Sequence, residues 1–103
     1  MDETMKFGAS APLTMGVELE LQVIDRRTGD LTRGASDLIH LVERKPFPGD
    51  VKPEITESMI EISTAVHSEF RPLRDQLRSM RDALVLAADR LDLRLAGGGA
   101  HPF

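Results

Sequence analysis

The chain of 103 residues contains no cysteine, tryptophan or tyrosine, and its four aromatic residues are all phenylalanines. Without cysteine, neither a disulfide framework nor a cysteine-based zinc site is possible. No stretch of about 20 apolar residues is present that could span a bilayer. The first ten residues, MDETMKFGAS, lack the apolar core of a secretory signal. We therefore expect a cytoplasmic protein that does not associate with a membrane.

The chain also has fewer basic than acidic residues. It contains thirteen Lys and Arg residues and seventeen Asp and Glu residues, which gives a formal net charge of −4. No basic block stands out, and the arginines around 71–81 alternate with acidic residues, so nucleic-acid binding is not expected. Hydrophobic residues make up 41% of the chain. That share is typical of a folded domain with its own core rather than of a disordered segment.

Hydrophobic periodicity predicts an α+β domain, because segments with a two-residue repeat alternate with segments that repeat every three to four residues. In chain order the predicted elements are a flexible arm at 1–13, a strand at 16–25, a turn at 26–30, a short helix opened by Ser36, a second strand at 57–64, a helix at 69–91 with Ser68 able to cap it, and a short strand at 93–97. This order favours helices layered against an open sheet.

The first strand carries two glutamates on one face. In TMGVELELQVID the apolar side chains alternate with Glu18 and Glu20, whose Cα atoms would lie about 6.6–6.8 Å apart. Glutamates at this spacing can converge on a hard cation such as Mg²⁺, which takes oxygen ligands. Glu61 lies on the polar face of the second strand and would add a third carboxylate if the two strands are neighbours. On spacing alone the commoner alternative stays open, namely a solvated face of an antiparallel sheet.

The three histidines, His40, His67 and His101, have no mutual spacing that indicates a metal site or a catalytic relay. His101 differs from the others because it follows three glycines, where a backbone can approach a ligand closely. The glycines at 97–99 do not form a phosphate-loop signature.

Three segments follow one another in a characteristic order: GVELELQVID at 16–25, ESMIEIST at 57–64 and, after the long helix, GGGAHPF at 97–103. Together they resemble the start of the glutamate–cysteine ligase type 2 family of carboxylate–amine ligases. The resemblance extends from about Thr14 to Phe103 and departs from the family pattern at Ala100, where threonine is usual. It covers only the first part of the family's catalytic domain, so we expect residues 14–103 to be an N-terminal portion of that domain.

The resemblance implies a glutamine-synthetase-like fold, with helices packed on one face of a curved antiparallel sheet that binds ATP and Mg²⁺. It implies that a carboxylate, typically the γ-carboxylate of glutamate, is joined to an amine such as cysteine through an acyl phosphate. By position, Glu18, Glu20 and Glu61 correspond to metal-binding carboxylates. Glu54 and His101 correspond to residues that line the substrate or nucleotide side. No catalytic residue is assigned, and we expect the isolated chain to be inactive.

A second hypothesis is a non-catalytic α+β module that binds partners or forms homo-oligomers through a sheet edge. The two hypotheses differ in what the strand glutamates do. In the module, glutamine at position 18 or 20 would have little consequence, whereas in the full-length enzyme it would abolish turnover.

Overall fold

The structure, a computed structural model, describes residues 14–102. The predicted arm at 1–13 and Phe103 lie outside the described residues. In chain order the elements are β2 (Val17–Asp25), α2 (Ala35–Val42), β3 (Asp50–Pro53), β4 (Met59–Ser63), α3 (Phe70–Arg90) and β5 (Leu93–Pro102).

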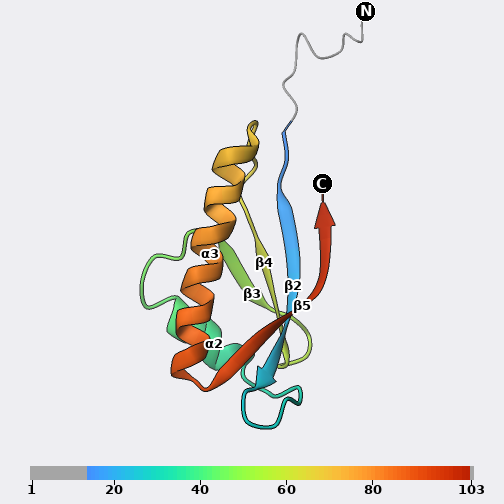
Figure 1. Cartoon of the computed structure of the whole chain (residues 1–103), viewed down its shortest axis with the longest axis vertical. Helices are drawn as coiled ribbons and strands as arrows, with labels where there is room; N and C mark the ends of the chain where they lie inside the picture. The colour runs from blue at the N-terminus through green and yellow to red at the C-terminus, as the bar shows by residue number, and fades with distance from the viewer. Residues whose placement is uncertain (1–13, 103) are drawn as a thin grey trace, which may run out of the picture.

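The strands form one four-stranded sheet in the order β3-β4-β2-β5. All three pairings are antiparallel. The long helix α3 runs beside the sheet, and α2 lies near its lower end (Figure 1). Both helices cover the same face of the sheet, because residues of α2 and α3 belong to one buried cluster with residues of the strands. The structure shows an α+β arrangement of a four-stranded antiparallel sheet with two helices, while the glutamine-synthetase-like fold stays a prediction.

The core forms between the apolar face of the sheet and the two helices. In β4, Ile60 and Ile62 are buried while their neighbours Met59, Glu61 and Ser63 remain partly exposed, as the two-residue repeat predicts. The remaining buried residues of the cluster come from β2, α2, α3 and β5: Val23, Ala35, Leu38, Val42, Met80, Leu84, Ala87, Ala88 and Leu93. Each fully buried leucine or isoleucine contributes roughly 1.5–3 kcal/mol to folding.

The segment predicted as one strand at 57–64 is in fact the second half of a hairpin. Asp50–Pro53 forms β3, which pairs with β4 so that Val51 lies opposite Ile62 and Lys52 opposite Glu61. The prediction missed β3 and placed the start of β4 too early. The proline is compatible with β3 because this strand forms an edge of the sheet, where one N–H per two residues needs no partner.

The start of α2 is stabilised by a residue distant in sequence. Ser36 was expected to cap this helix, but it lies inside the first turn and the cap position, Gly34, makes no side-chain cap hydrogen bond. Instead, Gly34 N–H and Ala35 N–H donate to the backbone oxygen of Glu57, over 3.1 and 2.9 Å. The Glu57 carboxylate accepts from Ser36 N–H at 3.2 Å and from Ser36 Oγ at 2.8 Å. Glu57 therefore satisfies donors that a helix start leaves unpaired.

Helix α3 spans Phe70–Arg90, close to the predicted 69–91, and Ser68 does not cap it, since the cap position is Glu69 and no side chain bonds there. Leu91 N–H donates to Ala88 O at the other end. Asp92 then adopts a positive φ of 60°. This left-handed conformation, most often supplied by glycine, ends the helix and turns the chain into β5.

The glycine-rich segment at 97–99 belongs to a strand. β5 continues to Pro102, five residues beyond the predicted strand at 93–97. Glu20 pairs with Gly99 and Leu21 with Gly97, so Gly98 is an extra residue in β5. This irregularity is a β-bulge, which shifts the register and bends the strand. As a result, the last residues of β5 lie beside the first half of β2.

Candidate metal centre

The face of the sheet that points away from the helices carries the charged residues. Across the central strands Glu20 lies directly opposite Glu61, and Glu61 lies opposite Lys52. Because residues opposite each other in antiparallel strands point to the same face, these three side chains form one row. Two like charges directly opposite destabilise a sheet unless a positive charge compensates them. The row therefore has the electrostatics of a cation site.

A third carboxylate joins this row from the β3–β4 turn. Glu54 follows β3, and its N–H donates to Met59 O at 3.4 Å, which carries the hairpin pairing one step further. Since Glu54 lies two residues beyond Lys52, it faces the same side of the sheet. One carboxylate oxygen from each of Glu20, Glu54 and Glu61 lies within 4.8 Å of the others, and all three residues are half-buried.

The three carboxylates lie close enough to affect one another's ionisation. The pKa of Glu54 is raised above its ordinary value, first by a hydrogen bond with Glu61, then by partial desolvation and by the negative charges of Glu20 and Glu61. Lys52 acts in the opposite direction, and its Nζ lies 3.9 Å from Glu61 Oε2. The charge of Lys52 thus compensates only part of the negative charge of the three carboxylates.

The spacing of these oxygens fits a hard divalent cation. Opposite oxygens of an octahedral Mg²⁺ shell are about 4.2 Å apart, given metal–oxygen distances of 2.0–2.1 Å. Neighbouring oxygens of the same shell are about 2.9 Å apart, so side-chain adjustments would bring the Glu20, Glu54 and Glu61 oxygens, which lie within 4.8 Å of one another, to a combination of these two spacings. Three carboxylates fill half of a six-ligand shell, and the remaining positions suit water or substrate phosphates.

The predicted site residues divide into three groups. Glu20 and Glu61, both predicted as metal ligands, do lie together, and Glu54, predicted for the substrate or nucleotide side, supplies the third carboxylate. Glu18 lies one row further along the same face, opposite Ser63 of β4, and is outside this group of three. His101 pairs with Glu18 through the backbone of β5, and its side chain lies outside the described part of the chain.

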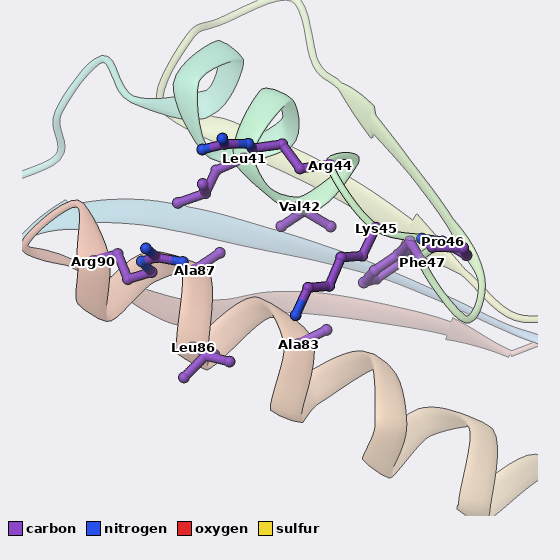
Figure 2. A pocket seen from close by; sticks show the side chains of 10 residues that line it. All are labelled: Leu41, Val42, Arg44, Lys45, Pro46, Phe47, Ala83, Leu86, Ala87 and Arg90. Atoms are coloured by element: carbon purple, nitrogen blue, oxygen red, sulfur yellow. The ribbon is translucent and has the colours of Figure 1, made fainter.

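A separate groove of about 480 Å³ lies on the helical side of the sheet, between α3 and the end of α2 with the loop that follows it. Figure 2 shows Lys45 reaching from this loop toward α3, with Phe47 beside it. The groove is lined by Leu41, Val42, Arg44, Lys45, Pro46, Phe47, Ala83, Leu86, Ala87 and Arg90. It contains no carboxylate, histidine or nucleophile, so the ionisable cluster and the groove are distinct features on opposite sides of the sheet.

Residues 14–103 match Glutamate-cysteine ligase family 2 (GCS2). A protein of Janthinobacterium sp. (strain Marseille), named "Putative glutamate--cysteine ligase 2", is 56% identical over 99 residues, which are 96% of this chain and 27% of the relative. Proteins with the same name from Herminiimonas arsenicoxydans and Chromobacterium violaceum are 56% and 54% identical over the same share of this chain and 27% and 26% of their own lengths.

The chain belongs to glutamate–cysteine ligase family 2. The resemblance noted from the three sequence segments is thereby confirmed. The chain spans about a quarter of the length of these curated relatives. The matched region of the family includes all three residues of the carboxylate cluster. Within residues 14–102, no helix is both long and apolar enough to cross a membrane.

Proposed function

We propose that this chain provides part of the active site of an ATP-dependent carboxylate–amine ligase, and that Glu20, Glu54 and Glu61 are its Mg²⁺ ligands. The observation that carries the proposal is the meeting of these three carboxylates on the open face of the sheet. Membership of glutamate–cysteine ligase family 2 supports the reaction class. The names of the relatives support glutamate as the carboxylate substrate and cysteine as the amine. Consumption of ATP and of a thiol substrate fits the cytoplasm.

The proposed reaction has two steps. A carboxylate oxygen of the first substrate attacks the γ-phosphorus of ATP, the bond to the β-phosphate oxygen breaks, and ADP leaves. The amine then attacks the acyl carbon of this acyl phosphate, inorganic phosphate leaves, and the amine proton is lost as the amide forms. Glu20, Glu54 and Glu61 would hold Mg²⁺, which would neutralise charge on the phosphate oxygens during the transfer.

The residues of this chain contribute positioning rather than covalent chemistry. Glu20 and Glu61 belong to the two central strands, whose opposite face is packed against the helices. The buried layer beneath them fixes the backbone from which both carboxylates project. Such a preorganised set of ligands stabilises developing charge without reorganisation during the reaction. We propose that the isolated chain has no ligase activity, because it spans about a quarter of the relatives' length.

The alternative function is a non-catalytic module that forms oligomers through a sheet edge. The observation that favours it is the position of β5, a strand of ten residues at one edge of the four-stranded sheet. An exposed edge strand is a template for pairing with another chain. In this case the glutamates would be a solvated face with no metal to hold.

Calorimetric titration of the chain with Mn²⁺ and Mg²⁺ separates the two functions. We expect the parent to bind the metal and Glu20→Gln/Glu61→Gln to lose binding by at least tenfold, since two of three charged ligands become neutral. Glu18→Gln should change affinity by less than threefold because Glu18 lies in the next row. The matched control is Glu43→Gln, an exposed glutamate after α2. Equal affinities in all four proteins would contradict the metal centre and favour the module.

A further inference from the structure

One cation lies beside the carboxylate cluster. Lys52 projects from the edge strand β3 onto the polar face, directly opposite Glu61 in the β3–β4 register. Its Nζ is 3.9 Å from Glu61 Oε2, and the lysine side chain is 63% exposed against 18% for the glutamate. The ammonium group therefore lies on the solvent side of the cluster, where a ligand would arrive.

The ion pair between Lys52 and Glu61 is loose. A separation of 3.9 Å is longer than a hydrogen bond between an ammonium and a carboxylate. An ion pair at this distance holds an exposed lysine side chain only weakly. Lys52 has a flexible four-carbon stem and three N–H donors, so its ammonium group is able to turn from Glu61 toward an incoming anion without breaking a strong contact.

A positive charge at this position acts oppositely on two kinds of ligand. It repels a free divalent cation, which also seeks Glu61, and so lowers the affinity for the bare ion. It attracts the phosphate oxygens of a metal–polyphosphate complex, which the three carboxylates repel. The net effect is a preference for the metal that arrives together with phosphate.

We propose that Lys52 is a specificity-determining residue that makes the Glu20–Glu54–Glu61 centre favour a magnesium–triphosphate complex over the free metal ion. In this role the lysine weakens binding of the bare ion and donates to a phosphate oxygen of the complex. The inference rests on the proposed function, because it requires that the three carboxylates hold a metal.

Two titrations of the full chain test this role, one with Mn²⁺ alone and one with the non-hydrolysable analogue adenosine 5′-(β,γ-methylene)triphosphate at saturating Mg²⁺. The parent should bind the triphosphate complex more tightly than Mn²⁺ alone. For Lys52→Met we expect binding of Mn²⁺ to tighten roughly three- to tenfold, as removal of one nearby charge at a solvated site implies. The same variant should bind the magnesium–triphosphate complex at least threefold more weakly.

Two further variants serve as controls. Lys52→Arg keeps the positive charge and should restore both affinities to within about twofold of the parent. Lys45→Met removes a lysine from the groove on the helical side of the sheet and should leave both affinities unchanged. Thermal unfolding of each variant verifies that the changes do not arise from loss of the fold.

The outcomes separate the inference from the function beneath it. If the parent does not bind Mn²⁺, the carboxylate centre itself fails, and the proposed function fails with the role of Lys52. If the parent binds Mn²⁺ but Lys52→Met behaves like Lys45→Met, only the role of Lys52 is overturned. Affinities that move in the same direction for both ligands, or a parent that binds Mn²⁺ and not the complex, also overturn it.

Discussion

Among the glycines whose surroundings the structure describes, Gly49 has the least room for a side chain. A Cβ built at this position would lie 2.7 Å from both Sδ and Cε of Met80 and 3.1 Å from the backbone oxygen of Ser63. Met80 is fully buried in the core. The absence of a side chain at Gly49 therefore lets the loop before β3 pack directly on α3.

We expect Gly49→Ala to destabilise the chain by about 1–3 kcal/mol, because the added methyl group overpacks a filled region. The methionine is flexible enough to move in part, but the carbonyl of Ser63 belongs to β4 and is not. Urea unfolding followed by circular dichroism measures the effect. The matched control is Gly97→Ala, where a Cβ would meet nothing within 4 Å and the change should stay within about 0.5 kcal/mol. Equal stabilities of the two variants would show that the loop relaxes freely.

At the residue scale, strand alternation assigns Glu20 and Glu61 to polar faces without knowledge of the fold, and the structure brings their carboxylates together. The substrate or nucleotide side that the resemblance implies for Glu54 stays a prediction. The carboxylate of Glu54 reaches the other two only because β3 and β4 form a hairpin. The sequence does contain a signal for this hairpin. Apolar Val51 lies between the charged residues Asp50 and Lys52, and a segment with turn-forming residues follows before Met59.

At the scale of elements, α2 depends on the β3–β4 turn through Glu57. The pKa of the Glu57 carboxyl is lowered from its ordinary value, first by the side-chain hydrogen bond from Ser36 and then by the backbone N–H of the same residue. A carboxylate at a helix start also interacts favourably with the helix dipole. The turn and the helix should therefore lose stability together when this carboxylate is neutralised.

We expect the stabilising effect of Glu57 to depend on pH. Because its pKa is lower in the folded chain than in the unfolded chain, the folded state binds fewer protons and the contribution is fully present above the unfolded pKa. It disappears as the pH falls through the folded pKa. The parent should therefore be more stable than Glu57→Gln at pH 7, and the difference should shrink below about pH 4.

Urea unfolding of both proteins between pH 7 and pH 3 measures this difference. In the background of Ser36→Ala, which removes the hydroxyl that shifts the pKa most, the dependence on pH should be weaker. A stability difference between parent and Glu57→Gln that stays constant across this range would contradict the role of the charge.

The elements with a strong repeat were predicted and those defined by partners were not. Helix α3 repeats its apolar residues over six turns, so its position needed no tertiary information. Strand β3 has four residues and carries too short a pattern to be recognised beside the stronger repeat of β4. The glycines of β5 have no side chains to show a repeat, and they are extended because β2 pairs with them. The expected cap of α2 was wrong for a similar reason, because the start of this helix is bonded by Glu57, which lies 21 residues from Ser36 in the sequence.

At the scale of the whole molecule, the sheet separates a layer that stabilises from a face that carries charge. The buried residues of β2 and β4 point toward the helices, while their alternate residues point toward the carboxylate cluster. One pair of strands thus serves both purposes through its two-residue repeat. Apolar burial on one face offsets the repulsion among the carboxylates on the other. Because that repulsion is present when no metal is bound, the carboxylate cluster should lower the free energy of unfolding of the metal-free chain.

We expect Glu54→Gln to raise the melting temperature of the metal-free chain at pH 7. Because the pKa of Glu54 is raised in the folded chain, an ionised Glu54 destabilises the fold at pH values above that pKa. The stability gained by the glutamine variant should therefore vanish below the ordinary carboxyl range.

The melting temperature of the parent should rise by on the order of 5 °C when the Mg²⁺ concentration is about tenfold above its dissociation constant, since a ligand that binds only the folded state stabilises it. Glu54→Gln should gain much less. Differential scanning fluorimetry with and without Mg²⁺ measures both effects, with Glu43→Gln as the control. A variant that is less stable without metal, or that gains as much from Mg²⁺ as the parent, would mean that Glu54 supports the hairpin rather than the metal centre.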